Sequence, residues 1–306
     1  MPLVYIIILN WNGWRDTVKC VELVLKATYP NYRILIVDNG STDDSVKVLS
    51  EEFPDVEILQ NGENLGYTGG NNRGIERAIA EGAEYLFILN NDTFAKDKDF
   101  LQPLVEAMEK DEQVGIASGM IYNYDPPHLI QYAGGYTSFY TGKSYAIGDR
   151  MLDKGQFNLP GEVQCASGAA MLIRADVLRK VGMFDETLFM FYDELDLSMR
   201  VKAAGYKIVY VPQSKIYHKV GASAGKNYAM VVFHLIRNRI WIERRYASKF
   251  QYFIFNLYFW GYLLPRILLG QIVKRRFHIL KVVVLAVWEG FFRACSSEKK
   301  SLHNGK

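Results

Sequence analysis

The chain has 306 residues, of which 49% are hydrophobic and 23% charged, and its formal net charge at pH 7 is +3. This length suits one large α/β domain with an appended region, and the apolar content can build a packed core, which excludes a disordered protein. Three widely spaced cysteines exclude a disulfide framework and a cysteine-based zinc site, so a reducing cytoplasm is favoured.

Short apolar runs alternate with helical patterns over the first 90 residues, which predicts βαβ units and a parallel sheet buried on both faces. The N-terminal run lacks the basic lead-in and the cleavage site of a signal peptide, so it is interpreted as a buried strand. The predicted strands are Val4–Leu9, Arg33–Val37, Val56–Leu59 and Tyr85–Leu89.

Helices are predicted between and after these strands. Asp16 is expected to cap the first, and residues 41–44 offer several caps for a second that ends near Phe53. Further along, Asp193 to Ala204 predicts a helix closed by Gly205. A strand is expected over 208–211, with a stop at Pro212.

Each of the first four strands is followed by a polar cluster. The clusters are residues 10–13, 38–43, 64–67 and 90–93. In an open parallel sheet the ligand crevice lies outside the carboxyl ends of the strands. The four clusters are therefore predicted to converge on one site.

Two carboxylates in these clusters suit a nucleotide ligand. Asp38 follows an apolar strand, which is a suitable place to bind the base and ribose of a nucleotide, although a helix-capping loop is the alternative. Asp92 is chemically suited to a hard divalent cation that also takes diphosphate oxygens.

Three more carboxylates stand at the start of the predicted helix over 193–204. Asp196 and Arg200 are spaced i,i+4 and are expected to pair, which leaves Asp193 and Glu194 as candidates for a general base. Acidic residues also complement a helix dipole, which is the alternative explanation. His218 is a candidate metal ligand, with a purely structural histidine as the alternative.

The C-terminal part of the sequence differs from the rest in charge. Residues 226–306 hold 15 Lys and Arg against 3 Asp and Glu, whereas residues 1–225 hold 21 against 30. Two domains are predicted, a catalytic one over 1–225 and a basic, aromatic helical one over 226–306. The second is expected to meet anionic lipid headgroups, and a helical subdomain that only packs on the body is the alternative.

Within this region, the run from Phe250 to Pro265 carries no charge. We expect Pro265 and Arg266 to interrupt it before the roughly 20 residues that a transmembrane helix needs. Tryptophans alternate here with basic groups, as in helices that lie in the membrane interface. Attachment to one face of the membrane is therefore favoured over a span.

Several motifs occur in a fixed order along the chain: residues 37–43, Asn64-Leu65-Gly66-Tyr67, residues 69–74, Leu89-Asn90-Asn91-Asp92, Gly168-Ala169-Ala170, residues 193–197, Arg200 and His218. Together they resemble glycosyltransferase family 2, and most closely its rhamnosyltransferase-like branch, with matching order and spacing over roughly residues 3 to 222. The resemblance implies an α/β GT-A fold, a mostly parallel Rossmann-like sheet flanked by helices. The composition of the C-terminal part adds an amphipathic, helical, membrane-associating region to this fold.

The resemblance also implies residue roles. Asp38 would contact the nucleobase, and Asp92 and His218 would bind the metal. Glu194 stands where the family has its catalytic Asp, and Asp193 where it has the preceding Glu, so either is a candidate base. Asn90 replaces the first Asp of the family's DxD motif. The full set of donor-binding candidates is Asn10, Asn12, Asp38, Asn39, Gly40, Asn64, Gly66, Asn71 and Asn91.

The implied activity is inverting transfer of a sugar with Mn²⁺ or Mg²⁺. The expected donor is dTDP-rhamnose or a UDP-sugar, and the expected acceptor is a lipid-linked saccharide or a polysaccharide. The enzyme is expected to be cytoplasmic and peripheral on the inner face of the cell membrane, without a nucleic-acid partner. A Rossmann dehydrogenase is disfavoured because no G-x-G-x-x-G follows the first strand. A sugar-nucleotide nucleotidyltransferase and a non-catalytic membrane-attached scaffold are the alternatives.

Overall fold

A computed structural model describes residues 1–219 and 227–293, so residue 226 and residues 294–306 of the predicted second domain lie outside the described residues. The chain forms two compact units. The first comprises Met1–Tyr136, Tyr145–Glu186 and Asp193–Ser223, and the second comprises Thr137–Ser144, Thr187–Tyr192 and Ala224–Lys306. Two short internal segments thus group with the C-terminal helices, which the charge pattern of the sequence did not indicate.

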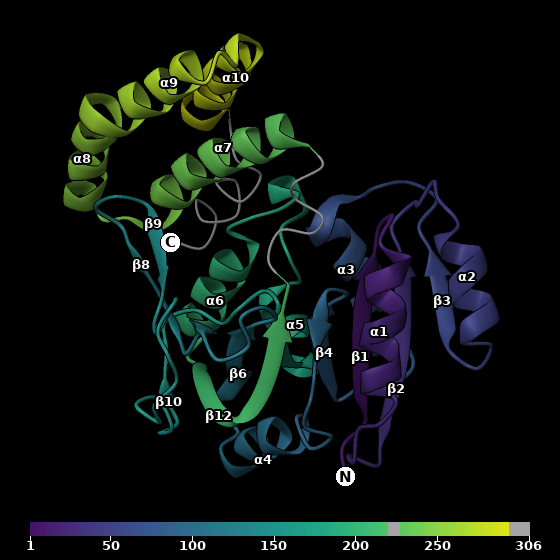
Figure 1. Ribbon diagram of the computed structural model, residues 1–306. Coiled ribbons are helices and arrows are strands. Elements are labelled where there is room, and N and C mark those ends of the chain that lie inside the picture. The colour runs from purple at the N-terminus through teal and green to yellow at the C-terminus, as the bar shows by residue number, and fades with distance from the viewer. Residues whose placement is uncertain (220–226, 294–306) are drawn as a thin grey trace. The chain divides into compact units, whose positions relative to one another are not determined.

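Within the described residues, ten strands of the first unit form one mixed sheet with the main order β10-β12-β6-β11-β4-β1-β2-β3 (Figure 1). Strands β5 and β7 add to β12 and β6. The strand bounds are β1 Val4–Asn10, β2 Tyr32–Asp38, β3 Glu57–Gln60, β4 Tyr85–Asn90, β5 Thr93–Phe94, β6 Val114–Asn123, β7 Ile130–Tyr132, β10 Gly161–Glu162, β11 Ala170–Arg174 and β12 Lys207–His218. The four strands predicted before residue 90 are confirmed and are parallel to one another.

Helices cover both faces of this sheet, as the continuous apolar runs predict. In β1, Ile6 and Ile8 enter one buried cluster, and Tyr5 and Ile7 enter the cluster on the opposite face, because side chains alternate along a strand. The helices are α1 Trp14–Val24, α2 Ser45–Glu52, α3 Gly66–Ala80, α4 Gln102–Lys110, α5 Ala175–Val181 and α6 Asp193–Ala203. A 3₁₀ turn, η1, spans Glu186–Leu188, and β8 Gly135–Ser138 pairs with β9 Lys143–Ala146.

The predicted cap at Asp16 is wrong. The N-cap of helix α1 is Gly13, three residues before Asp16, and no side chain caps the helix. The Asp16 carboxylate instead lies 3.1 Å from Nζ of Lys219, at the end of β12. Asp16 thus forms an ion pair with a residue that is far away in the sequence, instead of the local capping hydrogen bond that the sequence pattern predicts.

The predicted strand stop at Pro212 is also wrong. Strand β12 continues through Pro212 to His218, with a shift in its register against β6 between Val211 and Lys215. Proline has no amide hydrogen to donate, but an irregular stretch of the ladder does not require one. The continuation is what carries His218 to the site.

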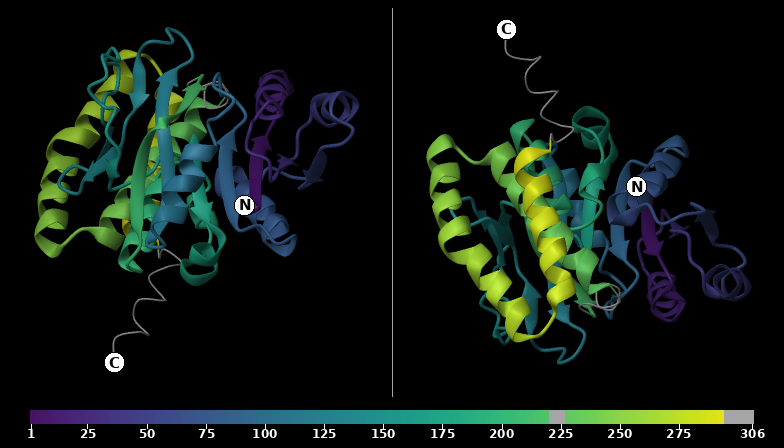
Figure 2. Two further views of the ribbon diagram at one scale, coloured as in Figure 1. Left: turned by 90° about the horizontal axis from the view of Figure 1, so that it is seen from below. Right: turned by 90° about the horizontal axis from the view of Figure 1, so that it is seen from above.

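The second unit contains the helices α7 Tyr228–Tyr246, α8 Lys249–Tyr258, α9 Leu264–Val273 and α10 Phe277–Phe292, and a π-helical turn, η3, over Phe259–Leu263. Their core includes Ile240, Phe255, Phe259 and Val283, all fully buried. Gly290 lets α10 approach α7 closely, since a Cβ there would lie 2.7 Å from a methyl group of Ile240. Figure 2 shows α10 beside the preceding helical segment.

The predicted interruption at Pro265 and Arg266 is wrong. Helical structure runs without a break over Lys249–Val273, 25 residues that are long and apolar enough to cross a membrane by length and composition. Pro265 lies in the first turn of α9, directly after the π-helical turn, so the proline falls where the regular α-helical hydrogen-bond pattern is already interrupted.

One segment of the second unit has an unusual backbone. Phe189, Phe191 and Tyr192 all have φ near +65°, a conformation that is costly for bulky residues. The side-chain amide of Asn238, fully buried in α7, donates hydrogen bonds to the carbonyl groups of Leu188, Met190 and Phe191 at 2.8–3.0 Å. These three bonds offset part of the backbone strain.

Candidate active site

The polar strand ends of the first unit meet at one edge of the sheet, as predicted. Asn10 lies opposite Asp38 in the β1–β2 register, and Leu9 lies opposite Asn90 in the β1–β4 register. Parallel pairing alone therefore places the three polar clusters side by side.

Asn10 links the first two clusters and is completely buried. Its amide donates to Oδ2 of Asp38 at 3.0 Å and to Oγ of Ser41 at 3.1 Å, and its carbonyl oxygen accepts from Oγ1 of Thr17 at 2.8 Å. The other Asp38 oxygen accepts from the Ser41 backbone amide at 3.0 Å. Asn10 thus fixes the Asp38 carboxylate, and its side chain has no exposed surface with which to contact a nucleotide-sugar donor.

The second cluster folds back over the first. Oδ1 of Asn12, which has a φ of +51°, accepts from the backbone amides of Thr42 and Asp43 at 2.7 and 3.2 Å. Gly40 has a φ of +72°, and a Cβ there would lie 2.5 Å from the backbone of Glu63. Both conformation and space therefore require glycine at this turn.

Asn39 ties the third cluster to the second. Its amide donates to Oδ1 of Asn64 at 3.1 Å and to the carbonyl of Gly66 at 2.9 Å, and its oxygen accepts from Asn61 and the Leu65 amide. Asn39 is 2% exposed, so its role in the structure is to hold these loops.

Asn71 and Asn91 are also buried. Asn71 donates to the carbonyl of Tyr67 at 2.9 Å, and its side-chain oxygen has no hydrogen-bond partner within the described residues. Asn91 donates to Thr17 Oγ1 at 2.9 Å. The predicted donor-binding asparagines are thus brought together, chiefly as a buried scaffold that shapes the loops.

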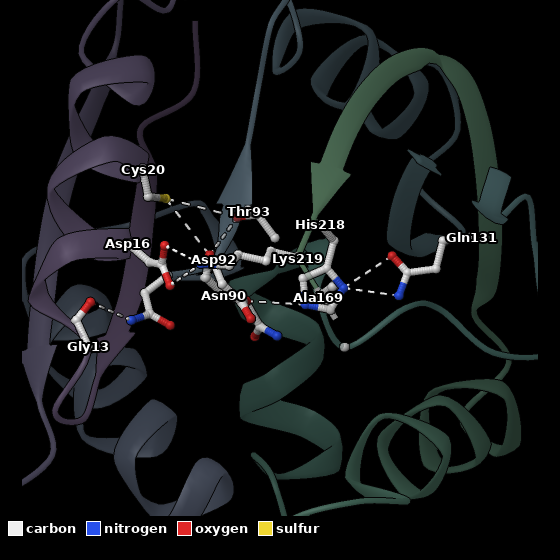
Figure 3. A network of polar contacts seen from close by, with 12 residues as sticks. Gly13, Asp16, Cys20, Asn90, Asp92, Thr93, Gln131, Ala169, His218 and Lys219 are labelled. Atoms are coloured by element: carbon white, nitrogen blue, oxygen red, sulfur yellow. Dashed lines mark hydrogen bonds and ion pairs between the residues drawn. The ribbon is translucent and has the colours of Figure 1, made fainter. Parts of the chain in front are cut away.

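The two predicted metal ligands meet although they are far apart in sequence. The pairing of β5 with β12 places His218 opposite Thr93, next to Asp92. The His218 Nε2 atom lies 3.2 Å from Oδ1 of Asp92, and both side chains are largely buried. Figure 3 shows the pair together with Lys219, whose backbone amide donates to the Asp92 carbonyl at 2.9 Å.

This pair fits a divalent cation as a partial ligand set. Two ligands at right angles around an ion with bonds of about 2.1 Å lie about 3 Å apart, close to the observed separation. No group of three or more His, Cys, Asp or Glu side chains suited to a metal occurs within residues 1–219 and 227–293. Asp92 and His218 would therefore hold an ion together with ligands from outside the chain, such as diphosphate oxygens.

The candidate bases lie at the first turn of α6. Asp193 is 3% exposed and Glu194 is partly exposed. A Cβ on Gly168 would lie 3.7 Å from Cβ of Glu194 and 3.8 Å from the hydroxyl of Tyr67, which donates to the Gly168 carbonyl at 2.6 Å. The predicted pair of Asp196 with Arg200 is confirmed at 2.9 Å and anchors the same helix.

The pKa values of Glu194 and Tyr67 are both raised in this site. Burial raises the pKa of Glu194 above the ordinary value for a glutamate. Burial also raises the pKa of Tyr67 well above its usual value, and the negative charges of Asp193, Glu194 and Asp92 raise it further. The negative charges of both candidate bases and of Asp92 therefore act on one tyrosine.

Three contributors to this site were missed at the level of sequence. Tyr67 lies within a quoted motif, but its contact with Gly168 depends on folding. Lys219 follows His218 directly, and its pairing with Asp16 had no local signal. Gln131 contacts His218 from a three-residue strand that carries no motif at all.

Comparison with known proteins agrees with this geometry. The family model described as glycosyl transferase family 2 matches residues 5–182. The chain belongs to glycosyl transferase family 2. It is therefore a glycosyltransferase, and the resemblance inferred from its motifs is confirmed.

Relatives of this glycosyltransferase act on different sugars. An N-acetylglucosaminyl-diphospho-decaprenol L-rhamnosyltransferase of Mycobacterium tuberculosis is 28% identical over 218 residues, 66% of this chain and 71% of the relative. An O-antigen chain rhamnosyltransferase of Salmonella anatum is 22% identical, covering 87% and 82% of the two chains. A galactofuranosyltransferase of Mycobacterium tuberculosis is 24% identical, covering 73% and 72%.

Solved structures share the GT-A fold. A mannosyltransferase from Pyrobaculum calidifontis, solved with GDP-Man and Mn²⁺, matches with a TM-score of 0.58 at 13% identity, covering 95% of this chain and 87% of that one. GalNAc-T7, solved with UDP, GalNAc and Mn²⁺, matches with a TM-score of 0.62 at 17% identity, covering 78% of this chain and 47% of that one.

Proposed function

We propose that this transferase moves a hexose from a nucleoside-diphosphate sugar to an acceptor hydroxyl by a single displacement that inverts the anomeric carbon, with Mn²⁺ or Mg²⁺ bound. The observation that carries the proposal is the meeting of Asp92 and His218 at 3.2 Å, with the charges of Asp193 and Glu194 acting on the same tyrosine as Asp92. A cation ligand set and a base stand together in one unit.

The residues of this chain divide the reaction between them. Asp92 and His218 would hold the ion, which when bound neutralises negative charge on the leaving diphosphate. Glu194 takes the proton of the acceptor hydroxyl. At the same time the acceptor oxygen bonds to the anomeric carbon, and the bond between that carbon and the diphosphate breaks. The raised pKa of Glu194 brings it closer to neutral pH, where a general base works well. Asp193, one residue earlier, is the alternative base.

We further propose rhamnose, supplied as dTDP-rhamnose, as the first donor sugar to test, with UDP-sugars next. Two relatives are rhamnosyltransferases, and one of these is a diphospho-decaprenol enzyme, which supports a lipid-linked saccharide or polysaccharide as acceptor. The metal is supported by the Mn²⁺ in the structures of two fold relatives.

The transferase is proposed to be cytoplasmic and to work at the inner face of the cell membrane, attached through its second unit. One face of α8 and η3 packs into the core through Phe255 and Phe259, whereas the exposed face carries Phe253 and Trp260, which are 58% and 48% exposed. A helix held in a protein core along one side suits a position in the membrane interface better than a span. The basic turn between α9 and α10, Lys274-Arg275-Arg276, suits anionic headgroups.

A donor panel tests the proposed activity. The purified full chain is incubated with UDP-, GDP- and dTDP-sugars and Mn²⁺ or Mg²⁺, with lipid-linked acceptors present, and released nucleoside diphosphate is measured. Release from one donor that stops with EDTA is the expected result. Silence across the panel would favour the non-catalytic scaffold, and formation of a sugar nucleotide with release of pyrophosphate would favour the nucleotidyltransferase.

A further inference from the structure

The imidazole of His218 is held from both sides. Its Nε2 atom faces Asp92 at 3.2 Å, and its Nδ1 atom lies 3.1 Å from both Nε2 and Oε1 of Gln131 (Figure 3). Gln131 therefore meets the ring at the nitrogen that faces away from the candidate metal ligand Asp92. This arrangement fixes the orientation of the ring and gives Nδ1 a partner whether or not that nitrogen carries a proton.

Strand pairing explains how Gln131 reaches this place. Strand β6 pairs with β12 on one side, with His218 opposite Asn123, and with β7 on the other. The β6–β7 register shifts between Ile121 and Tyr122, and a bulge of this kind re-aims side chains. Ile130, fully buried beside Gln131, anchors the short strand, so the amide is supported by packing on a rigid element.

We propose that Gln131 is a positioning residue that holds His218 with Nε2 towards Asp92 and supports the metal-binding tautomer by accepting its Nδ1–H; this rests on the metal site of the proposed function. A histidine that binds an ion through Nε2 must carry its proton on Nδ1. The Gln131 carbonyl oxygen accepts that Nδ1–H, which leaves the Nε2 lone pair directed to the side of Asp92. Partners of this kind commonly contribute 10–100-fold to metal affinity.

An amide suits this position because it serves both states of the ring. When Nε2 of His218 carries the proton and donates to Asp92, the amide Nε2 of Gln131, which lies 3.1 Å from the bare Nδ1, donates to it. Both amide atoms lie at the same 3.1 Å from Nδ1, so either orientation makes a hydrogen bond. Gln131 thereby keeps the ring in one orientation with and without the ion.

The test measures Mn²⁺ binding to the full chain, with and without UDP, by the loss of the free-ion signal in electron paramagnetic resonance. Gln131→Leu is expected to weaken binding about 10–100-fold. Gln131→Glu keeps an acceptor for Nδ1–H and is expected to bind as tightly as the wild type or more so. Gln213→Leu is the matched control, an exposed glutamine on the same strand as His218, and is expected to change nothing.

The outcomes separate the two proposals. Wild-type affinity in Gln131→Leu, with binding lost in His218→Ala, would overturn the role of Gln131 and keep the metal site. No Mn²⁺ binding by the wild type would overturn the metal site and the positioning role with it. A loss in Gln131→Leu that Gln131→Glu fails to restore, with equal thermal midpoints, would also contradict the tautomer role, because a carboxylate accepts the same hydrogen bond.

Discussion

Two buried polar positions, one at the strand ends of the first unit and one in a helix of the second, differ in their hydrogen bonding. In the first unit Asn10 and Asn39 are buried, and their amides donate hydrogen bonds to neighbouring loops. In contrast, neither oxygen of the fully buried Glu243 of the second unit has a hydrogen-bond partner among the described residues, and the helices of that unit expose Phe253 and Trp260. Hydrogen bonds thus hold the strand-end amides in place, whereas the burial of Glu243 is costly unless its carboxyl group keeps a proton.

The largest expected effect tests the chemistry of the first unit. Glu194→Gln removes the proposed base while preserving size, so transfer should fall about 10²–10⁴-fold with donor affinity within a few-fold of the wild type. Turnover by product release and donor binding by calorimetry measure the two effects. Asp193→Asn is the matched control, and a larger loss there would transfer the role of base to Asp193.

The pH profile of the wild type sharpens the same prediction. Burial raises the pKa of Glu194, so the unprotonated base is lost at a higher pH than for an ordinary glutamate. The acid limb of kcat/KM should therefore lie above the usual glutamate range. An acid limb at or below that range would contradict Glu194 as the base.

Next in size is the cost of breaking the strand-end network. Asn10→Ala removes the buried hydrogen bonds that the Asn10 side chain makes with Oδ2 of Asp38 and Oγ1 of Thr17, which should lower the free energy of unfolding by about 2–4 kcal/mol. Denaturant unfolding measures this loss. Asn31→Ala removes an exposed amide that makes one hydrogen bond, and should cost within about 0.5 kcal/mol. An equal loss of unfolding free energy in Asn10→Ala and Asn31→Ala would contradict a stabilising role for the buried hydrogen bonds of Asn10.

The exposed aromatic face of the second unit should decide membrane binding. Phe253→Ser and Trp260→Ser each remove apolar surface, so each should weaken binding to vesicles with anionic phospholipid about tenfold. Sedimentation with vesicles measures the partition. Leu159→Ser, at an 85% exposed leucine of the first unit, is the control. Equal binding of all variants would favour a helical region that only packs within the protein.

The smallest effect concerns Glu243, whose carboxyl group has no hydrogen-bond partner among the described residues. Burial raises the pKa of Glu243 to about 8 from an ordinary value of 4.5. Between these pH values the folded state keeps a proton that the unfolded state releases, so stability should fall as the pH rises towards 8. Glu243→Gln should flatten this dependence and raise the thermal midpoint at pH 9 by about 2–4 °C. A wild-type midpoint that rises from pH 6 to pH 8 in parallel with the variant would contradict this.

The sequence predicts the elements that depend on local patterns. The first four strands and the meeting of their polar ends follow from buried apolar runs and parallel pairing, and the Asp196–Arg200 pair follows from helical spacing. Pro212 misled the strand assignment because a register shift is a property of two paired strands, and neither sequence alone reveals it.

Contacts that need the whole fold could not be predicted. Gln131 reaches His218 through a bulged pairing with β6, and Tyr67 reaches Gly168 across the sheet edge. The pairing of Asn10 likewise depends on two segments, because its partners are Asp38 and Ser41 at and after the end of β2 and Thr17 in α1. The sequence indicated the candidate reacting groups, whereas the residues that contact them are recognised only in the tertiary structure.

The stereochemistry of transfer tests the central claim most directly. With the donor from the panel and its acceptor, the anomeric configuration of the new glycosidic bond is read by nuclear magnetic resonance from the one-bond carbon–proton coupling. Direct attack by a hydroxyl activated by Glu194 predicts a configuration opposite to that of the donor. Retention of the donor configuration would contradict a single displacement and the role of Glu194 as its base.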